Sequence, residues 1–467
     1  MRVGGFNDLE VVSCTFNDLL NANKKSIGIT GIKGQLRIPE YQRPYVWGFK
    51  QLKKLIDDLN EFNIKGKGNC FYFGSFILHQ VGNKLNIIDG QQRITSLMLL
   101  QLFQNTKVKS RIIYESPLSI SRIKSNIDDI NQKLHDTEIS LPHLDLNKIN
   151  VTLVVTKRED LAYTFFETQN TGGKRLSGAD IIKSHHLRAI NSNHIMGLQA
   201  KRWESKKMTS IEYVINILAK ARFWNVLQWK AFPFYRNELQ IKETIVNEFT
   251  EISRKDDLDI TYRTIEITKQ NNEEQSKFRS IYKAIRQPVY DGNNYFDFLI
   301  EYVDLYEMLF VEQTSHVVDH RFYEFRNQLL NGKNGTLFLK ELFEITLITY
   351  VSKFGFNDIY LFSLWCFRYI YSVRVINRRT VREESIFKFV QDEKLIDIIL
   401  NSFDKQQVIS YLKNYSYSIN TENCDKNNVK GRYILMLGNY FEKDFSIDEP
   451  VIERFDASLK KAIIGSL

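Results

Sequence analysis

The stretch "NIIDGQQRITSLMLL", Asn86–Leu100, decides the fold of the N-terminal part of the chain. The apolar residues "LNII" predict a β-strand, and "RITSLMLLQLF" predicts a helix because Ile94, Leu97 and Met98 recur at helical spacing. The polar residues "DGQQR" stand between these two elements and interrupt an otherwise apolar run. The stretch therefore predicts a strand that turns sharply into a helix, with polar side chains at the corner.

The residue types at this corner are those of an anion site. Gly90 permits a turn where a side chain would clash, and a helix that begins near Gln91 directs free N–H groups and its positive dipole end at the corner. Arg93 can hold a phosphate through two parallel hydrogen bonds, and Asp89 can hold a magnesium ion or orient a water molecule. The alternative is that Asp89 only caps the helix and Arg93 lies on the surface. Two glutamines in the first turn, where capping alone calls for Ser, Thr or Glu, favour the phosphate site.

A second stretch, "LRIPEYQRPYVWGF", repeats the Gln–Arg pair as Gln42 and Arg43. Two prolines hold this stretch extended. Three aromatic residues flank the pair: Tyr41, Tyr45 and Trp47. Aromatic rings interleaved with arginine can stack on bases or on a nucleotide ring, and thereby sense DNA or its modification. Packing in the core is the alternative, and for Trp47 alone it is the favoured one.

The third stretch is "FFETQNTGGKRLSGADIIKSHHL", Phe165–Leu187. Its tight turn contains Gly172 and Gly173, which can present backbone amides to an anion. A helix then starts, with Ser177 as its expected N-cap and Asp180 in its first turn. The two adjacent histidines near the end of this helix point in different directions, so a metal site there is disfavoured.

The composition is that of a soluble globular protein. The chain has 467 residues, of which 43% are hydrophobic and 25% charged, and this length predicts two or three domains. No signal-peptide pattern and no apolar run of membrane-spanning length occurs, so we expect a cytoplasmic protein with no membrane partner. The four cysteines are far apart and none forms a CxxC pair, which argues against disulfides and zinc. The net charge of +9 permits nucleic-acid binding, although an AT-biased genome would also enrich lysine.

The pattern of apolar residues along the sequence changes near residue 190. Before it, short strand-like runs such as Phe71–Leu78 and Asn150–Thr156 alternate with amphipathic segments such as Gln51–Phe62. After it, long apolar helical segments dominate, and "DIYLFSLWCFRYIYSVRV" is apolar nearly all round, which predicts a buried helix rather than a membrane span. The sequence thus predicts an α+β domain over residues 1–190 and an all-α domain over residues 191–467.

A cluster of arginines follows this buried helix in "RVINRRTVREE". Arg374, Arg378 and Arg379 form a candidate surface for DNA phosphates, and such contacts would make binding weaken steeply with salt. A solvated, charged helix end is the alternative interpretation.

The motifs "IPEYQRPYVW", "YFGSFIL" followed by "IIDGQQRITSL", and "FFETQNTGGKRLSGADIIKSHHL" together resemble the N-terminal domain of GmrSD-type modification-dependent restriction enzymes. This domain is shared with the phosphorothioate-sensing Ssp effector. The motifs stand in the family's order and spacing over roughly residues 8–190. The resemblance implies a ParB/sulfiredoxin-like fold that binds and hydrolyses a nucleoside triphosphate (ATP, GTP, CTP or UTP) with magnesium, and that senses or acts on modified phage DNA.

The resemblance also assigns residues. The catalytic corner would be formed by Asp89, Gln91, Gln92 and Arg93, with Asp89 as the magnesium ligand. The expected nucleotide-binding residues are Gln42, Arg43, Gly90, Asn170, Gly172, Gly173, Asp180 and Lys183. We expect the corner to face solvent, so that alanine at Asp89 or Arg93 removes hydrolysis and leaves the fold intact. No GxxxxGK[ST] motif occurs, which excludes an ordinary P-loop ATPase.

The sequence departs from long members of the family, which end in an HNH nuclease built around histidine and a metal. The histidines stop at His320, so the last 147 residues (467 minus 320) contain none. The leading hypothesis is an NTPase sensor or effector subunit of an anti-phage system, able to form oligomers, that acts with a separate nuclease or effector partner. The second is a non-catalytic nucleotide- or DNA-binding switch and protein-interaction module. The third, ranked last, is a nickase in which the N-terminal fold itself cuts DNA.

Overall fold

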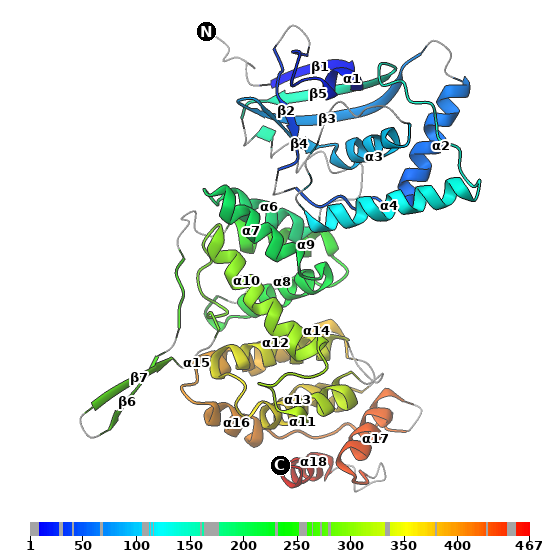
Figure 1. Cartoon of the computed structure of the whole chain (residues 1–467). Coiled ribbons are helices and arrows are strands. Elements are labelled where there is room, and N and C mark those ends of the chain that lie inside the picture. The colour runs from blue at the N-terminus through cyan, green and yellow to red at the C-terminus, as the bar shows by residue number, and fades with distance from the viewer. Residues whose placement is uncertain are drawn as a thin grey trace, which may run out of the picture. The chain divides into compact units, whose positions relative to one another are not determined.

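The computed structural model divides into two compact units, Met1–Ser205 and Lys206–Leu467 (Figure 1). Helix α7 (Asn193–Glu204) therefore belongs to the first unit, whereas the sequence placed the domain boundary before it. The structure describes residues 9–27, 31–39, 42–65, 69–104, 112, 114, 116–158, 161–162, 177–228, 232–251, 259–263, 265–270, 273–278, 282–331, 337–378, 381–425, 428–445 and 454–467.

The N-terminal unit is built on a mixed five-stranded sheet with the order β1-β5-β3-β4-β2. Its strands are β1 (Leu9–Thr15), β2 (Gln35–Arg37), β3 (Phe71–Val81), β4 (Lys84–Asp89) and β5 (Ile149–Thr156). β3 pairs with β5 in parallel and with β4 antiparallel, so β3 and β4 form a hairpin in the middle of the sheet. The three predicted strands are confirmed as β3, β4 and β5.

Helices cover this sheet, with α2, α3 and α4 on one face (Figure 1). The helices besides α7 are α1 (Phe16–Leu20), α2 (Phe49–Lys65), α3 (Gln91–Leu102), α4 (Pro117–His135) and α6 (Gly178–Arg188). The predicted apolar face of α2 is buried through Leu52, Leu55, Ile56 and Leu59. These side chains join the core of the sheet with Ile94 and Leu97 of α3.

The second unit is helical, as predicted. Its helices are α8 (Met208–Phe223), α9 (Glu238–Thr250), α10 (Asn293–Tyr306), α11 (His320–Phe325), α12 (Leu337–Phe354), α13 (Ile359–Ile376), α14 (Glu383–Glu393), α15 (Leu395–Asn401), α16 (Lys405–Asn414), α17 (Val429–Phe441) and α18 (Phe455–Gly465). Short helical turns lie at Val226–Gln228, Glu307–Val311 and Arg326–Leu330. An antiparallel hairpin of β6 (Ile265–Gln270) and β7 (Glu273–Phe278) extends away from these helices (Figure 1).

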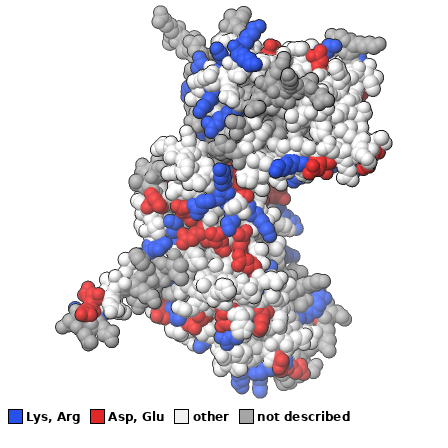
Figure 2. Space-filling view, viewed as in Figure 1, with Lys and Arg blue, Asp and Glu red and all other residues white. Residues whose placement is uncertain are grey.

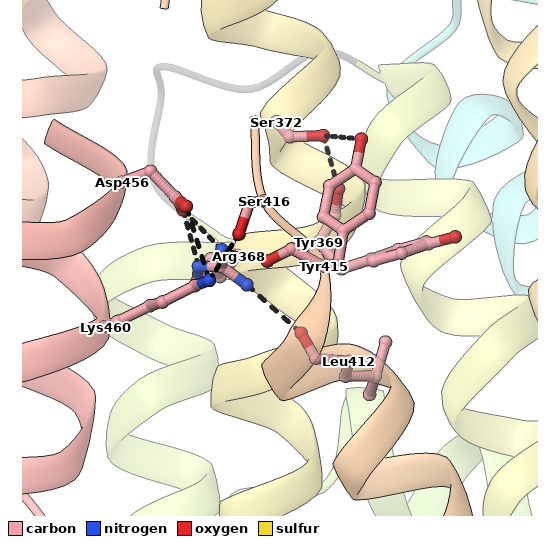
Figure 3. Close-up of polar contacts among 8 residues, drawn as sticks. All are labelled: Arg368, Tyr369, Ser372, Leu412, Tyr415, Ser416, Asp456 and Lys460. Carbon is pink, nitrogen blue, oxygen red and sulfur yellow. Dashed lines mark hydrogen bonds and ion pairs between the residues drawn. The ribbon is translucent and has the colours of Figure 1, made fainter. Parts of the chain in front are cut away.

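Helix α13 runs through the core of the helical unit. It is long and apolar enough to cross a membrane, but 89% of it is buried inside the protein, which is the pattern of a core helix. The prediction of a buried helix is confirmed. Figure 3 shows how α13 holds the end of the chain: the fully buried Arg368 donates to Asp456 of α18 through Nε at 2.8 Å and to the Leu412 and Tyr415 carbonyls.

Candidate functional site

The corner between β4 and α3 is built around Gly90. Its φ of 97° lies in the left-handed region that favours glycine. A Cβ atom at this position would collide with the ring of Phe76, a fully buried residue of β3. Helix α3 starts at Gln91 without a side-chain cap, and the Ile94 amide donates to the Gly90 carbonyl at 2.9 Å. The predicted strand–corner–helix unit is confirmed, and the first amides of α3 have no partner within the helix.

Arg93 and Asp89 lie on the side of the corner that faces β3. Arg93 Nη2 donates to the Ser75 carbonyl at 2.7 Å and to Asp89 Oδ2 at 3.3 Å, and Nη1 donates to the Phe73 carbonyl at 3.3 Å. The pairing of β3 with β5 shifts register between Tyr72 and Ser75. Arg93 therefore satisfies carbonyl groups at the irregular part of the strand.

The guanidinium of Arg93 is also fixed by packing. Its Cζ atom lies 4.7 Å from the centroid of the Phe76 ring, and a Cβ atom at Gly74 would collide with it. The side chains of Arg93 and Asp89 are only 26% and 31% exposed. Both residues are therefore only partly exposed at the corner, and Arg93 already uses most of its donors to hold the sheet.

Gln92 positions the extended loop of residues 42–48. Its Oε1 atom accepts from the amides of Val46 at 2.9 Å and Trp47 at 3.2 Å, and its Nε2 donates to the Pro44 carbonyl at 3.1 Å. The side chain is buried and its hydrogen bonds are satisfied. Gln92 thus ties the loop to the start of α3.

Gln42 and Gln91 meet where this loop reaches the corner. Gln42 is buried, and its Nε2 donates to the Ile88 carbonyl at 3.0 Å. Gln91 is only 5% exposed, and its Oε1 atom is buried with no hydrogen-bond partner. A buried acceptor without a donor is costly and calls for a bound group to satisfy it.

A pocket with an empty volume of about 340 Å³, part of it open to solvent, lies beside Gln91. Arg43 contributes a cation to its lining, and this side chain forms no hydrogen bond or ion pair within the described part of the chain. Ser116 and Ser119 contribute hydroxyl groups, and Gln42 closes the side towards β4. The pocket therefore combines one unpaired positive charge with several uncharged polar groups and the carboxylate of Glu204.

One residue of the third motif, Lys183, is connected to the pocket by an ion pair. Lys183 Nζ lies 3.1 Å from Glu204 Oε1, with both side chains buried, and Glu204 lines the pocket. Asp180 instead caps α6, because its Oδ2 accepts from the Ser177 amide at 3.3 Å while Ser177 Oγ accepts from the Asp180 amide at 3.2 Å. The predicted N-cap is confirmed, and Asp180 does not belong to the pocket lining.

Five predicted site residues fall outside the residues that the structure describes. They are Tyr41, Asn170, Gly172, Gly173 and Arg379.

Tyr45 is part of the core and not of a sensing surface. It is 1% exposed, its hydroxyl lies 2.9 Å from Ser96 Oγ and accepts from Asn126 Nδ2 at 3.2 Å, and burial raises its pKa. The prediction that Tyr45 reads DNA is therefore wrong, since a buried ring cannot stack on a base. Trp47 is partly exposed, and its carbonyl accepts from Asn126 at 2.8 Å.

The arginines after α13 do not form the expected surface. Arg374 is only 4% exposed, so its assignment to a DNA-binding surface is wrong. Arg378 is exposed and forms an ion pair with Glu422, and Arg379 lies outside the described residues. On the face shown in Figure 2, basic and acidic side chains are interspersed over the helical unit, whereas basic side chains gather along one side of the N-terminal unit.

Three residues that position the site were not found from the sequence: Ser119, Asn126 and Glu204. Asn126 is fully buried in α4 and bonds both Tyr45 and Trp47, while Ser119 Oγ accepts from the Tyr45 amide at 2.9 Å. The only local signal was a polar residue on the apolar face of an amphipathic helix, as Asn126 is on α4.

The fold and the corner define a mixed α/β domain with a polar pocket at the corner, joined in sequence to a helical domain. Residues 16–187 match the family described as GmrSD restriction endonuclease, N-terminal domain. This match confirms, over residues 16–187, the resemblance to the N-terminal domain of GmrSD-type restriction enzymes, a family that implies a restriction-like role in defence against phage.

The helical part has a match of its own. Residues 197–428 match a family of unknown function, DUF7834. A comparison with curated proteins gave no match.

Proposed function

We propose that this chain is a nucleoside triphosphate-hydrolysing sensor subunit of a restriction-like defence system and acts with a separate nuclease or effector protein. The observation that carries the proposal is the meeting of Arg43 and the orphaned Oε1 atom of Gln91 in one pocket at the start of α3. An unpaired guanidinium beside a helix N-terminus suits a polyphosphate chain.

The proposed roles follow from the contacts. Arg43 and the first amides of α3 hold the phosphates, and Gln91 Oε1 accepts a hydrogen bond from the attacking water. The water oxygen bonds to the γ-phosphorus as the bridging P–O bond breaks, and the water proton passes to an oxygen of the transferred phosphate, so that the nucleoside diphosphate and phosphate are released. Gln92 keeps the loop against α3, and Gln42 ties it to β4. Arg93 holds the corner in place through its hydrogen bonds to β3 and to Asp89.

Among the described residues beside the pocket, no carboxylate is free to bind magnesium. Asp89 is paired with Arg93, and Glu204 is paired with Lys183. The donor set therefore does not fit a magnesium ion held by Asp89 in this arrangement, and we route no step of the proposed reaction through a metal.

The same observation favours a second candidate, a nucleotide-dependent switch without hydrolysis. A general base must be free to accept a proton. Neither Asp89 nor Glu204 is free, so the pocket can bind a nucleotide and stabilise one arrangement of the loop at residues 42–48 without cleaving it. Nucleotide-dependent protection against heat, without release of phosphate, would identify this candidate.

The experiment is phosphate release from ATP, GTP, CTP and UTP, with and without magnesium, in the presence of no DNA, unmodified DNA or modified phage DNA. We expect Gln91→Leu to reduce turnover at least tenfold, a typical minimum for a lost transition-state contact. Lys53→Ala, an exposed residue on α2, serves as the control. Turnover that is equal in all three proteins would exclude the pocket as the catalytic site.

A further inference from the structure

Helix α13 buries two arginines six residues apart, and they differ in their partners. Arg368 is fully buried and is neutralised by Asp456, with its remaining donors directed at the Leu412 and Tyr415 carbonyls (Figure 3). This is the arrangement that a buried guanidinium requires, because a buried charge is costly unless it is paired and hydrogen-bonded.

Arg374 lacks such partners. It is 4% exposed, yet among the residues that the structure describes none forms a hydrogen bond or an ion pair with it. Burial lowers the pKa of its guanidinium, which is the direction expected for a cation withdrawn from water. The C-terminal end of α13 offers it only a partial negative charge.

A second buried cation lies near Arg374. Lys430 of α17 is 2% exposed, and its Nζ donates to neutral oxygens: the Asn420 carbonyl at 2.6 Å, Asn420 Oδ1 at 3.4 Å and the Glu422 carbonyl at 2.8 Å. Burial lowers the pKa of Lys430, and the charge of Arg374 acts in the same direction against the opposing effects of Cys424 and Glu422. The nearby Glu422 carboxylate is turned to the exposed Arg378.

Hydrogen-bond donors without partners lie on or at the end of the two helices, α13 and α17, that carry these cations. The hydroxyls of Tyr371 and Tyr433 and the Nδ2 atom of Asn377 are buried and unpartnered. The two tyrosine rings stack with centroids 5.8 Å apart, and Arg374 interacts electrostatically with both. Tyr371 and Asn377 lie three residues before and after Arg374, so the chain itself brings the three groups together.

We propose that Arg374, Lys430 and the unpartnered donors of Tyr371, Tyr433 and Asn377 form a binding site for a phosphate-type oxyanion in the helical unit. A phosphate accepts hydrogen bonds through several oxygens and supplies the negative charge that both cations lack. The burial of the donors suits inorganic phosphate or the terminal phosphate of a small nucleotide. The site is separate in sequence from the pocket at the DGQQR corner and does not depend on the function proposed for it.

Scanning calorimetry of the full-length chain tests the site, with chloride, inorganic phosphate or AMP as the added anion. Phosphate at ten times its dissociation constant should raise the melting temperature of the helical unit by roughly 3–6 °C. Arg374→Met should abolish this rise and should melt no lower than the wild type in chloride, because it removes an unpaired buried charge. Arg378→Met, an exposed arginine on the same segment, should keep the rise.

The outcomes separate the ligand sources and the competing accounts. A larger Arg374-dependent rise with AMP than with phosphate assigns the site to a nucleotide, and the reverse assigns it to free phosphate. An equal rise in the wild type and Arg374→Met, or no rise with either anion, overturns the proposal. Calorimetric titration of Lys430→Met with phosphate gives a second measurement. If the variant binds phosphate with an affinity within twofold of the wild type, the proposal is also overturned.

Discussion

At the scale of single residues, the polar side chains of the DGQQR corner divide into two groups. Arg93, Asp89 and Gln92 use their hydrogen bonds to hold the strand and the loop in place. Gln91 alone combines burial with an unsatisfied atom, and Arg43 brings the unpaired charge from another segment. The residues that shape the corner are therefore distinct from those suited to contact a ligand.

Arg93 should contribute to stability more than to ligand binding. We expect Arg93→Ala to lower the free energy of unfolding by roughly 2–4 kcal/mol, because it leaves the Phe73 and Ser75 carbonyls without their donors. Urea unfolding of the full-length chain measures this, with Lys53→Ala as the exposed control. A loss below about 0.5 kcal/mol, the usual range of a surface substitution, would contradict the structural role.

Glu344 of α12 should make stability depend on pH. Burial raises the pKa of its carboxyl to about 7, while a hydrogen bond from Tyr213 opposes the shift. The unfolded chain, with an ordinary pKa of 4.5, loses this proton at lower pH than the folded chain. Stability due to this group is therefore highest below about pH 4.5 and falls, by on the order of 3 kcal/mol, as the pH rises to about 7.

Glu344→Gln should remove this dependence, because glutamine still accepts the Tyr213 hydrogen bond but carries no charge. Urea unfolding between pH 4.5 and 8 should show the variant to be more stable than the wild type at pH 8, with the gap closing towards pH 4.5. The exposed Glu324→Gln is the control. A gap that is constant across this range would refute the assignment.

At the scale of the element, the turn from β4 into α3 depends on one glycine. Gly90→Ala introduces a side chain at a φ of 97° and drives its Cβ atom into Phe76. We expect a loss of about 1–3 kcal/mol in stability, a cost in the range of a non-glycine residue held in strained backbone. Thermal unfolding measures the loss, and Gly82→Ala, at a turn with open space around it, should cost less. Equal losses would show that the collision with Phe76 is relieved at no cost.

The elements around this corner were predictable from the sequence because their signals are local. The short apolar and aromatic run of β3, the glycine before α3 and the serine before α6 all act within a few residues. The hairpin of β6 and β7 was missed, since strands such as "EEQSKF" have no apolar alternation that would mark a buried face.

The site was only partly predictable from the sequence, because the contacts that decide it join residues that are far apart in the chain. Gln91, Arg43 and Gln42 were identified, but their motifs could not show that Arg93 reaches back to Ser75 or that Tyr45 turns inward to Ser96 and Asn126. Likewise, the sequence places Arg374 at the charged end of a helix, where exposure is expected. Its burial becomes evident only from the packing of α17 beside it. Tertiary contacts decide which polar residues of a motif remain available.

At the scale of the whole molecule, the helical unit secures the end of the chain through one buried ion pair. Asp456 of α18 faces Arg368 of α13, and Lys460 adds a second contact at 3.6 Å to Asp456. We expect Asp456→Asn to lower the stability of the helical unit by roughly 3–5 kcal/mol, because it leaves the charge of Arg368 uncompensated.

Limited proteolysis together with urea unfolding checks this expectation. The released α18 should be cleaved well before the remaining helices, whereas Asp392→Asn, an exposed aspartate on α14, should be cleaved at the wild-type rate. An Asp456→Asn protein with wild-type stability would show that Arg368 is satisfied by the Leu412 and Tyr415 carbonyls alone.

The central claim is that the pocket at the DGQQR corner holds a nucleoside triphosphate through Arg43, and the most direct test is a binding titration. Each of ATP, GTP, CTP and UTP is titrated into the wild type, Arg43→Ala and Lys53→Ala by calorimetry. We predict that at least one nucleotide binds and that Arg43→Ala weakens its affinity about tenfold or more, the equivalent of about 1.4 kcal/mol for a charged contact, while Lys53→Ala leaves it unchanged. Equal affinity in all three proteins, or no binding of any nucleotide, would contradict the claim.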